Sequence, residues 1–463
     1  MKIQPPHVSR MSRRAFCRSA AALAVTPLVL PSRLLRGATA RTSRVRLGQI
    51  GCGRIARTHD MPAVLDSDLA DIVAVSDVDA RRMEDGRRWV ENAYASRDQK
   101  PPVVAVFSDY RELLARPDIE AVVISVPDHS HAEIALAAIR AGKDVYLQKP
   151  MTMTVAEGIL LREAVEKSGR VLQVGSQQRS SVQFRRACEL IRSGRVGQVR
   201  RVEIGLPTDV TKSDSPEQPV PPGFNYDRWL GPAPYAYYTE QRVHPLLDYG
   251  RPGWMQNEAF CLGMITNWGA HHFDILHWAL DVEGGGPRQV EGRAEFPENR
   301  IWNVHGPFEV QLTYPGEVKV SVSSRHPNGL RFIGDDGWLF VSRDAQPLPP
   351  GLSSPLGELK ALDASDRKLL SPQGVRVQLP VSREHHENWL QCVRSRQSPL
   401  APVSVAHRSG SACIVSWIAM KLGRPLSWDA AAERFVDDPE ANGFLSRPDR
   451  APYGASHLGA SSL

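Results

Sequence analysis

The 463-residue sequence has few cysteines, no internal repeat and no long apolar run beyond its first 40 residues. None of its six cysteines stands in a Cys-x-x-Cys spacing, so neither a disulfide framework nor a cysteine-ligated metal site is indicated. Apart from the start of the chain, no stretch is long and apolar enough to cross a bilayer. With 42% hydrophobic residues, the chain can instead bury the cores of two globular domains.

Acidic residues are missing altogether from positions 1–40, which carry seven lysines and arginines. Without these seven, the formal net charge of +6 becomes −1, so the rest of the chain offers no electrostatic case for nucleic acid binding. A twin-arginine sequence at 12–16, an apolar stretch at 20–30 and a small-x-small site at 38–40 follow one another. They predict a signal peptide and periplasmic export through the twin-arginine (Tat) translocase; a disordered basic tail is the alternative.

The turn that organises the chain is the sequence Gly-Cys-Gly-Arg-Ile-Ala, which follows the apolar residues of a predicted strand. A strand that enters a helix over Gly-x-Gly-x-x-Ala is typical of a dinucleotide-binding turn. The first Gly allows the tight turn, the second lets the backbone approach a pyrophosphate, and Ala lets the helix pack close to the strand. The helix N-terminus adds N–H groups and partial positive charge for the phosphates. The expected cofactor contacts of this turn are Gly51, Gly53, Arg54, Ile55 and Ala56.

An acidic residue stands where the ribose of the nucleotide is expected. Residues 72–76 predict a second buried strand, and Asp77 ends it, 21 residues after Ala56. An acid about 20 residues beyond the turn binds the adenosine ribose hydroxyls in such folds. Its charge repels a 2′-phosphate and favours NAD, while Arg81 and Arg82 nearby keep NADP open. A solvated aspartate at a strand end is the alternative interpretation.

Residues 44 to about 170 alternate apolar strands with helical segments, which predicts an α/β domain with a doubly wound parallel Rossmann sheet. After about residue 180, alternating strands predict an α+β domain with a large, mainly antiparallel, open-faced sheet. Within this second domain, a single helix is predicted at residues 263–278 and one strand at residues 330–341. Residues 344–380 are predicted to form a loop. The expected organisation is a signal peptide at 1–40, a nucleotide-binding domain at 41–175, a substrate-binding and oligomerisation domain at 176–430 and a tail at 431–463.

Ligands of such a sheet bind beyond the carboxyl ends of its strands, and a lysine stands at one of these ends. Lys149 follows a predicted strand at 144–148. There it can donate a hydrogen bond to a substrate oxygen or help to move a proton; a surface lysine between strand and helix is the alternative. Other residues at strand ends are expected to contact the cofactor together with Lys149, namely Pro127, His131 and Gln148.

A second chemical motif lies at residues 263–278. In a helix, Asn267 and His271 share a face, and Asp274 stands three residues on, where its carboxylate could orient the imidazole. His271 suits a general base that takes a proton from a sugar hydroxyl; a helix histidine satisfied by its neighbours is the alternative. A metal site through His271, Asp274 and His277 is disfavoured because residues 271 and 277 lie far apart around a helix, so no metal is expected.

The order of these motifs resembles that of the Gfo/Idh/MocA family of sugar and inositol oxidoreductases. The resemblance rests on Gly-Cys-Gly-Arg-Ile-Ala, on Asp77, on Pro127 with His131, on Gln-Lys-Pro at 148–150 and on Asn-x-x-x-His-x-x-Asp at 267–274. It implies that Lys149 takes the place of the family's catalytic lysine and His271 that of its catalytic histidine. It also implies NAD(P)-dependent oxidation of a sugar or cyclitol hydroxyl and a homodimer or homotetramer.

Two positions depart from the family pattern. Gln148 replaces the usual Glu and Asn267 the usual Asp, which removes two carboxylates beside the catalytic pair. Asn267 keeps a hydrogen bond but cannot take a proton, and it is counted here with Lys149 and His271 as catalytic. The departures leave two alternatives to net oxidation. One is a redox-neutral glycosidase or lyase that works through a keto-sugar on bound NAD, as some family members do; the other is a non-enzymatic sugar-binding protein.

Residues 207–258 are rich in Pro, Tyr and Trp, and so long an irregular segment inside a domain is usually a functional loop. Its aromatic side chains predict a sugar lid, because aromatic faces stack on sugar rings; packing is the alternative. The expected substrate contacts are Arg179, Trp229, Tyr235, Arg251, Trp254 and His272.

Overall fold

The computed structural model describes residues 44–96, 103–210, 214–298, 300–349, 351–352 and 357–459. The predicted signal peptide at 1–40 lies outside these residues. In the part of the chain that the structure describes, no helix combines the length and the apolarity that a membrane span requires.

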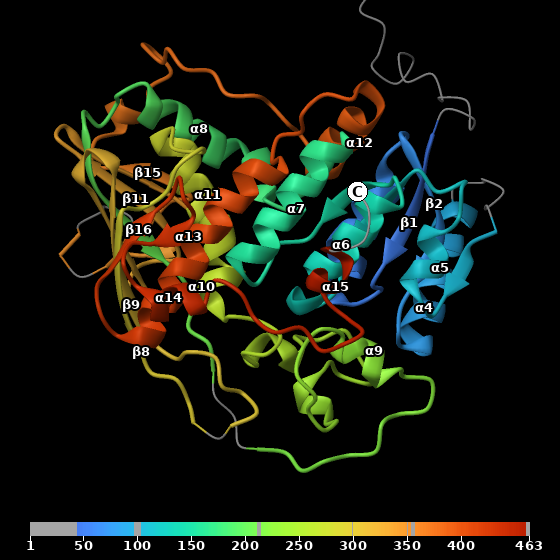
Figure 1. The fold of residues 1–463 in the computed structure, drawn as a ribbon. Helices are drawn as coiled ribbons and strands as arrows, with labels where there is room; N and C mark the ends of the chain where they lie inside the picture. Colours follow the sequence, from blue (N-terminus) through green and yellow to red (C-terminus); the bar gives the residue numbers. More distant parts are fainter. Residues whose placement is uncertain are drawn as a thin grey trace, which may run out of the picture. The chain divides into compact units, whose positions relative to one another are not determined.

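The first sheet has six parallel strands in the order β3-β2-β1-β4-β5-β6 (Figure 1). They are β1 (Val45–Ile50), β2 (Ala70–Ser76), β3 (Ala105–Phe107), β4 (Ala121–Ile124), β5 (Asp144–Leu147) and β6 (Leu172–Val174). Every residue of β2, β4 and β5 is buried, as expected for a parallel sheet covered on both faces. The strand order reverses between β1 and β4, and ligands bind at such a switch point.

Helices connect these strands, and their ends follow the local sequence. They are α3 (Met61–Asp66), α4 (Ala80–Ala95), α5 (Tyr110–Leu114), α6 (His131–Arg140) and α7 (Val155–Ser168). Thr154 and Glu157 form the capping box of α7, and Gly169 ends this helix with a φ of 64°, a conformation that glycine adopts without strain. The predicted parallel Rossmann sheet is thus confirmed.

The second sheet has nine strands in the order β15-β12-β11-β7-β10-β9-β8-β16-β17. They are β7 (Val199–Gly205), β8 (Gln289–Ala294), β9 (Phe308–Tyr314), β10 (Val318–Ser323), β11 (Gly329–Gly334), β12 (Gly337–Val341), β15 (Leu362–Ala364), β16 (Leu426–Asp429) and β17 (Arg434–Phe435). Only the β7–β10 pair is parallel among the ladders of this sheet in the described residues. The prediction of a mainly antiparallel sheet is therefore confirmed.

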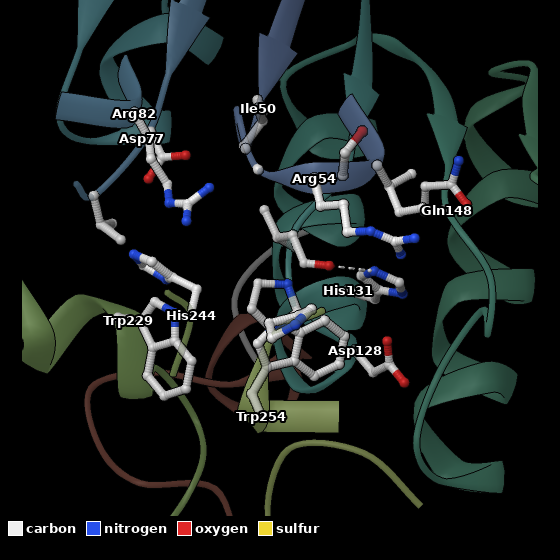
Figure 2. A pocket seen from close by; sticks show the side chains of 18 of the residues that line it. Ile50, Arg54, Asp77, Arg82, Asp128, His131, Gln148, Trp229, His244 and Trp254 are labelled. Carbon is white, nitrogen blue, oxygen red and sulfur yellow. Dashed lines mark hydrogen bonds between the residues drawn. The ribbon is translucent and has the colours of Figure 1, made fainter. Parts of the chain in front are cut away.

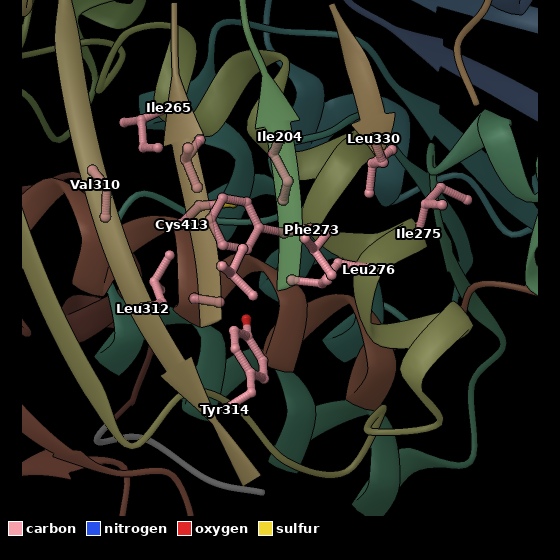
Figure 3. Packing of buried hydrophobic residues seen from close by; sticks show 14 of the residues in the cluster. Ile204, Ile265, Phe273, Ile275, Leu276, Val310, Leu312, Tyr314, Leu330 and Cys413 are labelled. Atoms are coloured by element: carbon pink, nitrogen blue, oxygen red, sulfur yellow. The ribbon is translucent and has the colours of Figure 1, made fainter. Parts of the chain in front are cut away.

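Three helices cover one face of this sheet: α8 (Val182–Arg192), α11 (Gly269–Leu280) and α13 (Val403–Leu422). In Figure 3, Phe273 and Leu276 of α11 lie against strand residues such as Ile204 and Leu312. Along β9, buried and exposed positions alternate, so the opposite face of the sheet is open. This packing fixes α11, and with it His271, against the sheet.

Three local predictions were wrong. Residues 330–341 form two antiparallel strands, β11 and β12, because Gly-Asp-Asp-Gly at 334–337 makes a turn. Residues 263–278 form two helices, α10 (Met264–Asn267) and α11, separated at Trp268; the glycine that follows favours the interruption. The predicted loop 344–380 contains the short strands β13 (Gln346–Pro347), β14 (Glu358–Leu359) and β15.

The segment between β7 and α10 folds against the first domain. It contains α9 (Tyr226–Leu230) and an aromatic cluster of Phe224, Tyr226, Trp229, Tyr238 and Phe260. The remaining helices are α12 (His385–Ser395), α14 (Pro439–Gly443) and α15 (Ala455–Gly459). The end of the described chain also packs on the first domain, since the Gly454 N–H donates to Glu133 Oε2 on α6 at 2.9 Å.

Candidate active site

The glycine-rich turn after β1 has the geometry that close approach of a ligand requires. Gly51 has a φ of 84°, and a Cβ built on it would lie 2.5 Å from the Ser125 carbonyl oxygen, so a side chain is excluded there. A Cβ built on Gly53 would meet no atom within 4 Å, because this position faces the open cleft. Ala56 is fully buried beneath the turn and lets the helix pack close to β1.

Asp77 lies at the end of β2, beside the turn. Its carboxylate accepts hydrogen bonds from the backbone N–H groups of Cys52 at 2.8 Å and Asp79 at 2.9 Å. Burial raises the pKa of Asp77, and these two N–H groups oppose the increase. Arg82 is engaged elsewhere, because its Nη2 donates to the carbonyls of Pro245 and Asp248. The Nη2 group of Arg82 is thus already bonded to protein, although Arg82 lines the cleft beside Asp77. The Asp77 charge would repel a 2′-phosphate and favours a ribose hydroxyl as its partner.

A cleft of about 1210 Å³, partly open to solvent, runs along the carboxyl ends of the strands (Figure 2). Twelve residues proposed from the sequence line it: Gly51, Gly53, Arg54, Ile55, Asp77, Pro127, His131, Gln148, Lys149, Trp229, Trp254 and Asn267. Its lining also includes residues that the sequence analysis passed over, among them Asp128 and His244. Asp128 follows Pro127 at the end of β4, and this position was a signal that could have identified it.

Lys149 meets Asn267 across the cleft. The Lys149 Nζ donates to the Asn267 backbone oxygen at 3.0 Å and to its Oδ1 at 3.3 Å. Burial lowers the pKa of Lys149, while the charge of Asp128 opposes this effect. The contact joins the end of β5 to α10 and so brings the two predicted catalytic segments together.

His271 lies in the first turn of α11, four residues beyond Asn267. It is 5% exposed, and its Nδ1 has no hydrogen-bond partner among the described residues. Burial, then the charges of Arg343 and Lys149, hold the pKa of His271 well below its usual range. The imidazole is therefore neutral at pH 7 and has a ring nitrogen able to accept a proton. His271 is not among the residues that line the cleft itself.

Asp274 does not orient His271, contrary to the prediction from helix spacing. Its two oxygens accept hydrogen bonds from Arg179 Nε at 2.7 Å and Nη2 at 2.9 Å. The Arg179 Nη1 also lies 2.8 Å from Glu283 Oε1. Arg179 is 2% exposed, so this pair ties α11 to the segment after β6, and the structure does not place the arginine in the cleft.

Other residues expected at the substrate also have protein partners. The ring nitrogens of His272 lie 2.9 Å from Asn328 Oδ1 and 3.4 Å from Gln178 Oε1. Arg251 Nη2 lies 3.7 Å from Asp209 Oδ1, and Tyr235 is 75% exposed. Of the aromatic residues proposed for the lid, the structure brings Trp229 and Trp254 to the cleft.

A buried carboxylate lies behind Gln148. The helix after the glycine-rich turn contains a π-helical turn, Ala56–Asp60, a feature frequent at functional sites. Asp60 Oδ1 accepts hydrogen bonds from Gln148 Nε2 at 2.7 Å and from His386 Nε2 at 2.9 Å. Burial opposes protonation of His386, but its hydrogen bonds to Asp60 and Glu384 prevail and raise its pKa to about 9. Sequence reasoning missed this network because His386 lies 326 residues from Asp60.

The cleft fits an NAD molecule on these observations. Gly53 leaves room for a pyrophosphate at the start of a helix, where free N–H groups favour anions. Asp77 stands at the adenosine-ribose position, and the far end of the cleft carries Lys149 and Asn267. The turns of the first sheet, the segment between β7 and α10, and α10 itself thus line one continuous site.

Comparison with known sequences agrees with an NAD-binding site. Residues 45–176 match the Gfo/Idh/MocA oxidoreductase family, NAD-binding Rossmann fold. Residues 208–337 and 371–455 match the C-terminal α/β domain of the same family. The two matches together cover most of the chain, including the whole first sheet and part of the second.

Individual relatives support the same assignment. The uncharacterised oxidoreductase ORF334 of Rhizobium meliloti is 32% identical over 197 residues, which are 42% of this chain and 54% of that protein. The scyllo-inositol 2-dehydrogenase (NAD(+)) of Bacillus subtilis (strain 168) is 24% identical over 313 residues, 64% of this chain and 74% of that protein. The chain spans about half the length of several curated relatives that it matches.

Among solved structures, the WlbA dehydrogenase from Bordetella pertussis, in complex with NADH and UDP-GlcNAcA, has a TM-score of 0.60 at 17% sequence identity. The likeness covers 83% of this chain and 98% of that one, and it concerns the fold. From the two domain matches, the chain belongs to the Gfo/Idh/MocA family of oxidoreductases, and its first domain is an NAD-binding Rossmann domain.

Proposed function

We propose that the protein is an NAD-dependent oxidoreductase that acts on a secondary hydroxyl of a sugar or cyclitol. The observation that carries the proposal is the contact of Lys149 with Asn267, four residues before His271, at one end of the cleft. Bound NAD would supply the acceptor for the hydride that leaves the substrate carbon. Relatives named for an inositol and solved with a nucleotide sugar support this substrate class.

Side chains of the protein accept the proton, stabilise the developing charge and hold one another in place. His271, neutral because burial and nearby cations lower its pKa, takes the hydroxyl proton. Lys149 in its ammonium form stabilises the negative charge that develops on the substrate oxygen. Asn267 holds the lysine in place with its backbone and side-chain oxygens. Trp229 and Trp254 line the cleft, and their apolar rings would limit the access of water to a bound substrate.

A panel of sugars and cyclitols, assayed by NADH absorbance, tests the proposal. Turnover with at least one compound is expected, together with a loss of about 10²–10⁴-fold in kcat for His271→Ala. The exposed variant Gln373→Glu is the control and should retain full activity. Absence of turnover across the panel in either direction would reject net oxidation.

The neutral side chains at 148 and 267 favour a second candidate, a redox-neutral glycosidase or lyase that proceeds through a keto-sugar. Asn267 cannot exchange a proton with the lysine, which suits a cycle in which the hydride returns from NADH to the same substrate. A chromogenic glycoside tests this reaction. Aglycone release that requires bound NAD supports it, whereas release by nucleotide-free protein rejects the mechanism. A purely sugar-binding role predicts instead that His271→Ala changes no turnover at all.

We also propose that the protein is exported to the periplasm by the twin-arginine pathway with its NAD already bound. The Arg13-Arg14 pair, the apolar stretch and the small-x-small site at 38–40 support this. Replacement of Arg13 and Arg14 by Lys should retain the protein in the cytoplasm. N-terminal sequencing of the periplasmic form should begin after residue 40.

We further propose that the open face of the nine-stranded sheet pairs with a second copy. The alternating exposure of β9 leaves alternate positions on this face exposed, and no helix of the described residues buries them. Light scattering on the purified protein tests the assembly: a dimer or tetramer is expected, and a monomer at all concentrations would contradict it.

A further inference from the structure

Asp128 places a carboxyl group in the cleft on the side of Lys149. Asp77 and Asp128 are the two acidic residues that line the described cleft, and Figure 2 shows them at opposite ends. Asp77 is already engaged by two backbone N–H groups. Asp128 begins the turn after β4, which is next to the turn after β5 that carries Lys149.

The protein itself holds these two turns together. The ring nitrogens of His131 lie 2.6 Å from the Pro150 carbonyl oxygen and 3.0 Å from that of Val126. One carbonyl belongs to the turn of Lys149 and the other to the turn of Asp128. The position of Asp128 relative to Lys149 is therefore set without a ligand.

The Asp128 carboxyl lacks the partners that a buried acid normally has. The residue is 4% exposed, and its Oδ2 has no hydrogen-bond partner among the described residues. The Cys261 thiol and the backbone N–H of Asp128 itself interact with the carboxyl and lower its pKa, but they leave Oδ2 unsatisfied. A buried carboxylate oxygen without a hydrogen bond costs free energy, so its presence in the cleft indicates a role there beyond packing.

The charges of Asp128 and Lys149 each shift the pKa of the other residue. Lys149 is the strongest charge acting on Asp128, and Asp128 is the strongest acting on Lys149. Cys261, Arg343 and Arg251 are the other groups that act on the lysine. Burial raises the pKa of Asp128 to about 7 and lowers that of Lys149, and each charge opposes the effect of burial on the other.

We propose that Asp128 is the positioning residue that keeps Lys149 in its ammonium form, because it supplies the carboxylate that positions 148 and 267 lack. The inference rests on the proposed function, in which Lys149 must carry a charge. Gln148 and Asn267 are neutral, so neither side chain offsets the burial that lowers the pKa of Lys149. The unpartnered Oδ2 of Asp128 compensates that charge from the adjoining strand end.

Titration of Lys149 by NMR tests the inference without any turnover. In protein labelled with ¹³C-lysine, the Cε signal of Lys149 is assigned by its absence from Lys149→Arg. In Asp128→Asn, we expect the midpoint of this titration to fall by about one pH unit, whereas Asp128→Glu should restore it. Asp118→Asn, at the opposite end of β4, is the matched control and should leave the midpoint unchanged.

Kinetics provide a second measurement once a substrate is known. The alkaline limb of kcat/KM should move to lower pH in Asp128→Asn by the same amount, and Asp128→Glu should restore it. Near-ultraviolet circular dichroism checks that each variant is folded. Equal Lys149 midpoints in wild type and folded Asp128→Asn would overturn the inference. If the midpoint shifts but no sugar is oxidised, the electrostatic pair stands and the proposed function fails.

Discussion

The side-chain amide of Gln148 donates a 2.7 Å hydrogen bond to the buried carboxylate of Asp60. The same Asp60 oxygen lies 2.9 Å from His386 Nε2, and Asp60 Oδ2 accepts a hydrogen bond from Ser125 Oγ at 2.6 Å. Asp60 is fully buried. A glutamine beside Lys149 thus has a structural reason: it satisfies a buried acid that a second carboxylate would repel.

Gln148→Glu should destabilise the protein by about 2 kcal/mol at pH 8. Repulsion from Asp60 and burial would raise the folded-state pKa of the new carboxyl above its unfolded value of about 4.3. The loss of stability is therefore small below the unfolded-state pKa and complete above the raised folded-state pKa. Urea unfolding at pH 4.5 and pH 8 measures it, with exposed Gln373→Glu as control. A loss equal at both pH values would contradict the repulsion.

Because of His386, the free energy of unfolding should decrease as the pH rises into the alkaline range. Its folded-state pKa is about 9 because Asp60 and Glu384 accept its hydrogen bonds despite burial. A raised pKa stabilises the folded state fully below the unfolded value of about 6.5, and this stabilisation is lost as pH rises through about 9. His386→Gln should remove on the order of 3 kcal/mol at pH 6 and little at pH 10. Urea midpoints of both proteins between these pH values are the measurement.

Gly51 and Gly53 should respond differently to alanine. Gly51→Ala must strain a φ of 84° and meets the Ser125 carbonyl oxygen at 2.5 Å, so a loss of about 2 kcal/mol or more is expected. Gly53→Ala meets no protein atom and should leave the unfolding midpoint unchanged while weakening NAD binding about tenfold. Calorimetry with NAD separates the two effects. Unchanged NAD affinity in Gly53→Ala would place the pyrophosphate elsewhere.

The charge of Arg343 should affect the pH at which kcat/KM falls on the acid side of its pH profile. Its guanidinium lies 4.6 Å from the centre of the Trp268 ring, and its charge lowers the pKa of His271. In Arg343→Gln, the pKa of His271 should rise by roughly half a pH unit, since the arginine is partly exposed and screened. The acid limb of kcat/KM then moves to higher pH. Arg325→Gln in the turn after β10 is the control, and coincident acid limbs would show that Arg343 does not act on His271.

The sequence by itself determined the elements that depend on local chemistry. The Gly-x-Gly-x-x-Ala turn, the Thr154–Glu157 capping box and the fully apolar strands act over a few residues, so their structure can be derived from neighbours in the chain. The same local rules locate Lys149 at a strand end and Asp77 after β2. They also predict the change from a parallel to a mainly antiparallel sheet.

Only the tertiary structure decided which side chains meet. Helix spacing placed Asp274 beside His271, but Arg179, 95 residues away, binds Asp274 instead, and the helix breaks at Trp268. His386, one partner of Asp60, lies 326 residues away in the chain, and Asn267, the partner of Lys149, lies 118 residues away. Such pairs depend on how two sheets and their helices pack, because burial makes each polar group require a partner that periodicity along one element cannot specify.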